Sequence, residues 1–397
     1  MTLKEEALRM HEVNRGKLTV QSKVAINDKH DLSLAYSPGV AEPCLEIERD
    51  EKAAYTYTMK SNMVGVVTNG TAVLGLGAIG AQASLPVMEG KAVLFKNFAD
   101  VDAFPICLDT KDPDEVIRTV ELMAPTFGGI NLEDIKAPEC FYIEQMLKER
   151  LNIPVFHDDQ HGTAIVTLAG LVNALRLVDK SFDEIKVVIN GAGAAGIAIV
   201  KLLHYFGVKD MVLCDSKGAI YEGRGAGMNA EKQAILAYTN KSNETGDLRS
   251  VMKDADVFIG VSLKDLVDEA MVQSMKRDPI IFAMANPDPE ITPERAKQAG
   301  ARVIGTGRSD YPNQVNNVLA FPGIFKGALS VRATDINEEM KVAAVHAIAG
   351  IISATELDED YVIPDPFNEQ VAEAVAKAVS EAAIKSGVSQ GEHVDQN

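Results

Sequence analysis

The chain has 397 residues, 46% of them hydrophobic and 24% charged, a balance typical of a globular protein with a sizeable core. At roughly 150 residues per domain, this length predicts two or three domains. The 57 acidic side chains outnumber the 39 basic ones, which gives a formal charge of −18. An acidic surface repels phosphate backbones and anionic lipids, so we expect neither nucleic acid nor a membrane as a partner.

The N-terminus and the cysteines favour a cytoplasmic protein. The first 18 residues predict a helix that ends near Gly16, and they contain three glutamates but no apolar core of a signal peptide. No apolar run reaches the ~18 residues that a membrane span needs. The four cysteines lie far apart and form no CxxC pair, which argues against a thiolate zinc site and a disulfide framework.

The predicted elements change character along the chain. A β-rich run is expected over residues 55–73 and a helix over residues 113–123. Beyond residue 160, predicted helices and strands alternate: helices over 163–177, 196–206, 335–353 and 366–386, and strands over 186–190, 211–215, 257–260 and 280–285. Such alternation predicts an α/β fold with a doubly wound parallel sheet. We expect a smaller α/β substrate domain over residues 1–160 and a Rossmann-type dinucleotide domain, with C-terminal helices, over residues 161–397.

The glycine pattern GxGxxG, typical of dinucleotide sites, occurs twice. The second copy, Gly191-Ala192-Gly193-Ala194-Ala195-Gly196, follows a predicted strand and opens a predicted helix. This context favours a phosphate site, because free N–H groups at a helix N-terminus bind pyrophosphate. The first copy, Gly75–Gly80, is followed closely by Pro86, which leaves little room for a helix. We interpret the first copy as a structural turn.

Asp215 ends the strand after the second glycine loop, 19 residues beyond Gly196. An acid at this place bonds the ribose hydroxyls of NAD and repels the 2′-phosphate of NADP. Ser216, Lys217 and Arg224 follow closely and could accommodate that phosphate, so both cofactors stay open.

Two acidic pairs are candidate metal ligands. Glu133-Asp134 and Asp158-Asp159 each lie beside apolar segments, where adjacent carboxylates are costly unless paired, protonated or metal-bound. Carboxylate oxygens suit a hard ion such as Mg²⁺ or Mn²⁺. The plainer alternative for either pair is helix capping.

Lys91 and Tyr36 are candidates for proton transfer. Lys91 enters what reads as an apolar strand, where it either extends its amine to solvent or has a chemical role. Burial and a nearby cation would lower its pKa toward the range of a base. Tyr36 stands before Ser37-Pro38-Gly39 and could present its phenol to a cleft, although core packing is the commoner outcome for a tyrosine.

Taken together, the chain resembles the malic enzyme family in its short bacterial form. The resemblance is carried in order by SLAYSPGVAEPC (33–44), MEGKAVLFKNFADVDAFP (88–105), FGGINLEDI (127–135), VFHDDQHGTA (155–164), NGAGAAGIAI (190–199), CDSKGAIYEGR (214–224), FAMANPDPE (282–290) and QVNNVLAFPGIF (314–325). It implies oxidative decarboxylation of (S)-malate to pyruvate and CO₂, with NAD or NADP and a Mg²⁺ or Mn²⁺ ion. It also implies a homodimer.

The resemblance assigns a role to individual residues. Tyr36 matches the family's general acid and Lys91 its general base, with Asp158 beside that base. The metal ligands would be Glu133, Asp134 and Asp159. Asn286 and Asn317 match asparagines that contact the substrate and the nicotinamide ribose.

One position departs from the family pattern. Larger family members carry an arginine for a malate carboxylate just before GLGxxG, where this chain has Ala72. Another residue, from this chain or from a second subunit, must then supply that charge. Two alternatives to the oxidative reaction are a malolactic-type lyase, whose members are longer, and a non-catalytic dinucleotide-binding protein.

Overall fold

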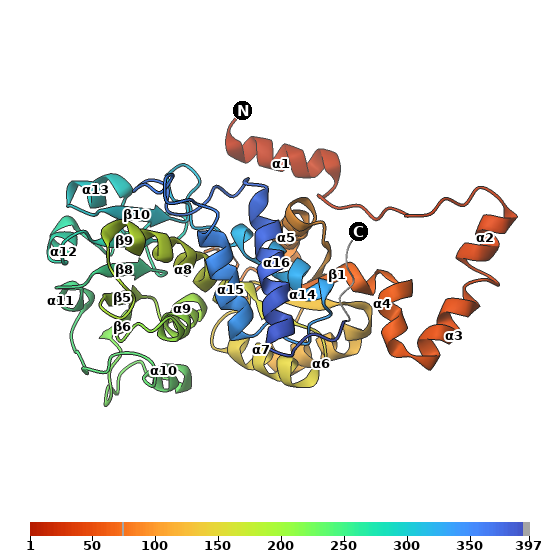
Figure 1. The fold of residues 1–397 in the computed structure, drawn as a ribbon, viewed down its shortest axis with the longest axis horizontal. Helices are drawn as coiled ribbons and strands as arrows, with labels where there is room; N and C mark the ends of the chain where they lie inside the picture. The colour runs from red at the N-terminus through yellow and green to blue at the C-terminus, as the bar shows by residue number, and fades with distance from the viewer. Residues whose placement is uncertain (74, 392–397) are drawn as a thin grey trace.

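The computed structural model describes residues 1–73 and 75–391, which build two β-sheets and the helices around them (Figure 1). The first sheet has the order β2-β1-β3-β4, and all of its pairings are parallel. Its strands are β1 (Met63–Thr68), β2 (Asp102–Cys107), β3 (Gly129–Leu132) and β4 (Val155–His157). Each strand leads into a helix: α5 (Ala81–Ala99), α6 (Pro113–Met123), α7 (Glu139–Arg150) and α8 (Asp158–Val178).

Both faces of the first sheet are buried. Val64 and Val66 of β1 belong to the core that contains α5, whereas Met63 and Val67 belong to a second core formed with α6 and α7. This alternation follows from the two-residue period of a strand. Because both faces are covered, the polar groups of this sheet can meet a ligand only at the ends of its strands.

The second sheet has the order β10-β9-β8-β5-β6-β7, with the short β7 antiparallel and the other strands parallel. The strands are β5 (Lys186–Asn190), β6 (Asp210–Asp215), β7 (Gly218–Ala219), β8 (Val257–Gly260), β9 (Ile280–Ala283) and β10 (Val303–Thr306). The helices between them are α9 (Ala194–Tyr205), α10 (Ala230–Ile235), α11 (Leu248–Met252), α12 (Glu269–Gln273) and α13 (Pro293–Gln298). Val187 and Ile189 pack with α8 and α9, and Val188 packs in a separate core with α11, α12 and α13. Helices on both faces confirm the doubly wound fold.

Three C-terminal helices join the two sheets: α14 (Phe321–Ser330), α15 (Glu338–Ala349) and α16 (Gln370–Lys385). The Phe95 ring of α5 lies 4.7 Å from Phe321 and 5.3 Å from Phe325, between ring centroids, and Phe325 also meets Phe156 of β4 at 5.9 Å. These edge-to-face contacts lie in a single core that contains residues of both sheets. The cluster fixes α5 relative to the end of β4, and this spacing positions the site described below.

Helix α8 is long and apolar enough to cross a membrane by length and composition alone. However, 67% of its most apolar 18-residue stretch is buried inside the protein, where α8 packs against α9 and α15. Helices at the core of globular proteins have the same character.

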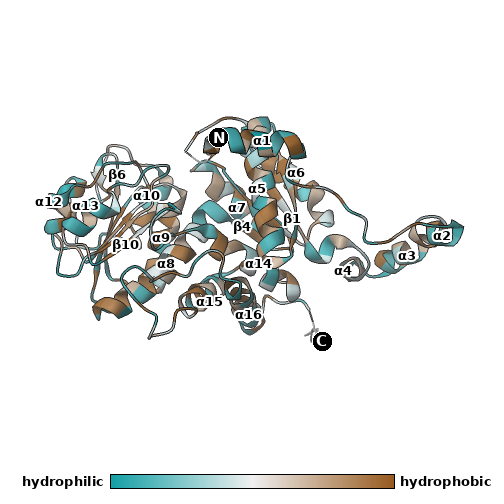
Figure 2. Ribbon diagram, turned by 90° about the horizontal axis from the view of Figure 1, so that it is seen from above, coloured by the Kyte–Doolittle hydropathy of each residue, from teal (hydrophilic) through white to brown (hydrophobic). Residues whose placement is uncertain are grey.

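The N-terminal segment is organised differently from the rest. It contains α1 (Leu3–Asn14), α2 (Lys29–Ala35), α3 (Ala41–Arg49) and α4 (Ala54–Tyr57), and none of these helices has a buried residue. Short 3₁₀ turns occupy Glu51–Ala53, Met59–Asn62, Ala124–Thr126 and Asn317–Leu319. We call residues 18–50 the N-terminal arm, and two perpendicular views show it extending away from the body (Figures 1 and 2).

Several predicted elements need correction. Of the β-rich run expected over residues 55–73, only Met63–Thr68 is a strand. Lys91 lies in helix α5 and not in a strand, and α5 forms although Pro86 is its sixth residue. A proline there removes one backbone hydrogen bond, and the burial of Met88, Ala92 and Phe95 on one helix face outweighs that loss. Helix α8 begins at Asp158, so both acids of that pair lie in its first turn.

Candidate functional site

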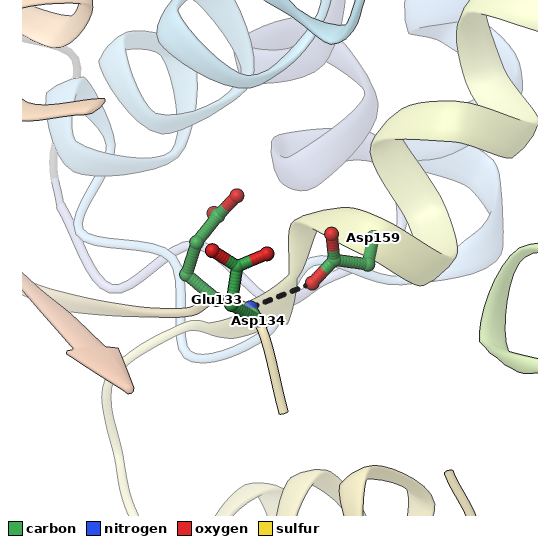
Figure 3. A group of neighbouring side chains, drawn as sticks. All are labelled: Glu133, Asp134 and Asp159. Carbon is green, nitrogen blue, oxygen red and sulfur yellow. Dashed lines mark hydrogen bonds between the residues drawn. The ribbon is translucent and has the colours of Figure 1, made fainter. Parts of the chain in front are cut away.

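The four acids predicted from sequence meet at the carboxyl edge of the first sheet. Strands β3 and β4 are parallel neighbours, and Leu132 pairs with His157. The residues that follow these two, Glu133 and Asp158, therefore leave the sheet at the same height. Glu133, Asp134 and Asp159 offer carboxylate oxygens that all lie within 4.8 Å of one another. Figure 3 shows their side chains grouped between the end of β3 and the first turn of α8.

The chemistry of this acid group fits a divalent metal ion. Burial raises the pKa of Glu133 well above its usual range, and the charges of Asp159, Asp158 and Asp134 raise it further, against the opposing effect of Lys91. A cation within the group would relieve this repulsion. The Asp134 backbone N–H donates to Asp159 Oδ2 at 2.8 Å, which orients that carboxylate toward the group (Figure 3). An all-oxygen set of this kind suits Mg²⁺ or Mn²⁺.

Lys91 reaches the same edge from helix α5. Its Nζ lies 2.6 Å from Asp158 Oδ2 and 3.0 Å from Glu133 Oε1, and its side chain is 10% exposed. The amine also lies 4.1 Å from the centroid of the Phe321 ring. Burial by itself lowers the pKa of Lys91, but the charges and hydrogen bonds of Asp158 and Glu133 exceed that effect and raise it. The expected lowering of the Lys91 pKa therefore requires the cation, because the neighbouring carboxylates by themselves act in the opposite direction.

Asp158 connects the lysine to a second polar side chain. It is completely buried, and its Oδ2 accepts hydrogen bonds from Lys91 and from Asn317 Nδ2, the latter at 2.9 Å. A methyl group at Gly162, one turn along α8, would lie 1.9 Å from Asp158 Oδ1. Gly162 is thus needed for the observed position of Asp158.

Sequence reasoning missed three residues of this site: Gly162, Phe321 and Asn131, whose amide donates to Glu133 Oε2 at 2.8 Å. All three lie inside segments that carried the family resemblance, but none has a charge or a spacing that marks it in a single sequence. Only the fold places them beside Asp158, Lys91 and Glu133.

The second glycine loop forms the tight turn that its pattern predicts. Gly191 follows β5 with a φ of +123°, and a methyl group there would lie 2.7 Å from the Val261 carbonyl oxygen. A methyl group at Gly196 would lie 1.8 Å from the Gly191 carbonyl oxygen. At Gly193, by contrast, nothing lies within 4 Å, so the turn is open where a pyrophosphate would approach. Helix α9 begins at Ala194, directly after this opening.

Asp215 ends β6 and is held by two cations. Its Oδ2 lies 2.5 Å from Arg224 Nη2 and 2.6 Å from Lys232 Nζ, and its Oδ1 accepts from the Lys217 backbone at 2.8 Å. Burial raises its pKa, but these hydrogen bonds outweigh burial and hold the pKa below its usual range. The ionised carboxylate and two cations therefore share this end of the sheet. Lys232 was not identified from the sequence.

The first glycine loop lies between the two sheet edges. Strand β1 ends at Thr68, twelve residues before Gly80, so this loop lacks the close strand-to-helix turn of the second copy. A methyl group at Gly75 would lie 3.3 Å from the carbonyl oxygen of Asn286, which follows β9. The Ala72 N–H donates to the Asp134 carbonyl at 2.9 Å. Ala72 therefore stands beside the acid group, as its place in the family pattern implies.

Tyr36 is not brought to this site within the chain. It follows α2 in the N-terminal arm, and 70% of it is exposed. The expectation that Tyr36 is held at a cleft is therefore wrong for one chain in isolation, because no described residue of the body packs over it closely enough to bury it.

Comparisons with known proteins show which family the chain is similar to. The family model "Malic enzyme, N-terminal domain" matches residues 15–148, and "Malic enzyme, NAD binding domain" matches residues 160–384. The chain is 67% identical to the bifunctional malic/malolactic enzyme of Bacillus subtilis over 98% of this chain and 95% of that protein. It is 56% identical to the NAD-dependent malic enzyme of Geobacillus stearothermophilus, over 96% of this chain and 79% of that protein. The solved malic enzyme of Pyrococcus horikoshii superimposes with a TM-score of 0.93 at 46% identity, covering 99% of this chain and 93% of that one.

Proposed function

The chain belongs to the malic enzyme family, and from this premise we propose that it oxidises (S)-malate and decarboxylates it to pyruvate and CO₂, with NAD or NADP as the hydride acceptor. The single observation that carries the proposal is the meeting of Lys91 and Asp158 with the acid group at one sheet edge. Family membership alone would leave open whether this chain retains the reacting groups.

Glu133, Asp134 and Asp159 are the proposed ligands of Mg²⁺ or Mn²⁺. A cation held there would polarise the hydroxyl and keto oxygens of the substrate and would offset the negative charge beside Lys91. Asp158 is a positioning residue, because its only acceptor contacts are with Lys91 and Asn317 among the described residues.

Proton transfer divides between two residues. Lys91, once neutral, takes the C2 hydroxyl proton of malate as hydride leaves C2 for the nicotinamide. Loss of the C4 carboxylate as CO₂ leaves an enolate, and Tyr36 delivers a proton to its C3 carbon. Asn286 and Asn317 would orient the substrate and the nicotinamide ribose. The adenosine half of the cofactor would lie over the Gly191–Gly196 loop, with its ribose toward Asp215.

A lactate-forming activity is the second candidate. Chain length does not distinguish the two reactions, contrary to the expectation that malolactic-type proteins are longer. The 67% identical relative has both activities in its name and nearly the same length as this chain. The lactate-forming reaction would require the reduced nicotinamide to stay bound, and the return of the hydride with a proton to pyruvate would give lactate. We propose malate oxidation as the principal activity. We also propose that the protein acts in the cytoplasm, which the four unpaired cysteines favour.

The decisive experiment combines a spectroscopic and a product assay. The protein would receive malate and Mn²⁺ with either NAD or NADP, and reduced nicotinamide, pyruvate and lactate would be quantified. Equal amounts of reduced cofactor and pyruvate are expected. Lactate without free reduced cofactor would support the malolactic reaction, and cofactor binding without any turnover would contradict both and leave a dinucleotide-binding protein.

A further inference from the structure

Glu290 is a fully buried carboxylate that no step of the proposed reaction uses. It lies between β9 and α13 and is 0% exposed. Burial raises its pKa, and the effects that oppose burial come from backbone N–H groups and from no cationic side chain of the described chain. A buried carboxylate without a cation is costly, so the groups that donate to it indicate its role.

The two oxygens of Glu290 fasten two different loops. Its Oε1 accepts from the Ser262 backbone N–H at 3.1 Å, in the loop after β8. Its Oε2 accepts from the Ala285 backbone N–H at 3.1 Å, in the loop after β9. The backbone carbonyl of Glu290 also accepts from the Val267 N–H at 3.0 Å, where the first of these loops ends. One residue thus holds the two loops at a fixed spacing.

Both loops lie at the carboxyl edge of the second sheet. Strands β8 and β9 are parallel neighbours whose last residues pair in register (Figure 1). The loop after β8 starts beside the glycine turn, because the Val261 N–H donates to the Asn190 carbonyl at 2.9 Å. The loop after β9 carries Asn286, the residue that follows the amide bound by Glu290. Glu290 therefore sets the spacing between the glycine turn and Asn286.

The loop after β8 is otherwise weakly held. Its Leu263 and Leu266 are 69% and 42% exposed, so apolar packing contributes little there. Its ion pair, between Lys264 and Asp288 at 3.3 Å, lies on the surface, where such pairs also contribute little. The buried hydrogen bonds of Glu290 are therefore the main restraint on this loop.

These contacts require both a carboxylate and a glycine. A carboxylate accepts at both oxygens, whereas the amide of a glutamine replaces one acceptor by a donor. A methyl group at Gly260, the last residue of β8, would lie 2.3 Å from Glu290 Cδ and 2.4 Å from its Oε1. Gly260 therefore leaves the space that the carboxylate occupies. Two separate positions thus offer independent ways to displace it.

We propose that Glu290 is a positioning residue for the nicotinamide half of the cofactor. It holds the loops after β8 and β9 at the spacing at which Asn286 orients the nicotinamide ribose, and it touches neither substrate nor cofactor itself. This inference rests on the proposed function for the role of Asn286. The adenosine half would lie over the Gly191–Gly196 loop, which Glu290 does not bind, so that half should bind independently of Glu290.

The first test compares NADH with ADP, which lacks the nicotinamide and its ribose, by calorimetry. Wild type should bind NADH with the lower Kd. Glu290→Gln should bind ADP as wild type does and should lose most of the preference for NADH. Hydrogen exchange of the Ser262 and Ala285 amides should become faster in this variant. Glu294→Gln, exposed on α13, is the matched control and should match wild type in all three measurements.

Turnover and a second variant separate positioning from folding. With malate, Glu290→Gln should lower kcat by about 100-fold, the loss that a displacement near 1 Å can cause, at an unchanged Mn²⁺ half-saturation. Gly260→Ala should repeat this pattern. In a Glu290→Ala background the added methyl group has room, so Gly260→Ala should cause no further loss.

The outcomes distinguish this inference from the proposed reaction. An equal loss of ADP affinity, an unchanged preference for NADH, or a wild type without that preference would overturn the positioning role of Glu290. A preference for NADH that Glu290→Gln loses, in a protein whose wild type turns over no malate, would support the positioning role and contradict only the proposed reaction.

Discussion

The two sheets present different chemistry at their carboxyl edges. The first ends in carboxylates, Glu133 and Asp134 after β3 and Asp158 and Asp159 after β4. The second ends in the glycine turn after β5 and in Asp215, which is already paired with cations. Both edges use the same parallel geometry. The side chains at each edge decide whether it attracts a cation or admits a phosphate, so substitutions should impair one edge and leave the other intact.

The largest effect is expected from Lys91→Ala at the first edge. Removal of the proposed base should lower kcat by about 10³–10⁴-fold, in the upper range for a general base. NAD binding, followed by calorimetry, should stay unchanged because the second edge is intact. Lys96→Ala, on the exposed face of the same helix, is the control. Loss of NAD affinity in Lys91→Ala would show that the two edges are not separable.

Asp159→Asn should weaken the metal site. Loss of one charged ligand is expected to raise the Mn²⁺ concentration for half-maximal activity by about 10–100-fold. Saturating Mn²⁺ should restore part of the activity, which a folding defect would not allow. An unchanged Mn²⁺ titration would remove Asp159 from the proposed ligand set.

Gly162→Ala tests the positioning of Asp158. The added methyl group would meet Asp158 Oδ1 at 1.9 Å, so the carboxylate must move away from Lys91. A displacement near 1 Å can lower kcat by about 100-fold, and the pH profile of kcat should shift as Lys91 loses its neighbour. Gly225→Ala, where nothing lies within 4 Å, should match the wild type. A normal rate and profile for Gly162→Ala would contradict the positioning role of Asp158.

Asp215→Ala perturbs only the second edge. It leaves Arg224 and Lys232 without their shared carboxylate, so the ratio of kcat/KM for NADP to that for NAD should rise by about tenfold. The Mn²⁺ titration should not change. A ratio that stays the same would place the adenosine ribose away from Asp215.

Asp256→Asn is a test at the amino edge of the second sheet, away from both sites. Asp256 pairs with Lys180 at 3.0 Å and Lys276 at 2.9 Å. Burial raises its pKa, but hydrogen bonds from Lys186, Lys276 and Lys180 outweigh it and lower the pKa. A lowered carboxyl pKa stabilises the fold above the unfolded value near 4, and this contribution is lost as the pH falls through the folded pKa.

The Asp256→Asn variant should therefore lose about 1–2 kcal/mol of unfolding free energy at pH 7, discounted for the partly exposed lysines. The difference from wild type should shrink below about pH 4, as measured by urea unfolding. The kcat value should not change. A difference that is constant with pH would assign the loss to packing.

The sequence predicted those parts of the site whose signals are local. The Gly191–Gly196 loop and Asp215 were found because turn, strand and helix patterns all lie within some 30 residues. The helix α5 was missed because Pro86 and the apolar run around Lys91 suggested other structures, and burial against the C-terminal helices overrode both signals. No local pattern predicted that Tyr36 is exposed. Its surroundings depend on where the whole arm lies.

The sequence by itself determined which chemical groups are present: four acids, one lysine in an apolar stretch, one complete glycine loop and the family they resemble. Only the tertiary structure decided how these groups meet. Lys91 and Asp158 are 67 residues apart, and Asn317 and Asp158 are 159 apart, so their contacts depend on the packing of α5 and α14 against β4. Local patterns record periodicity and turn chemistry, whereas contacts at such separations result from the burial of whole helices.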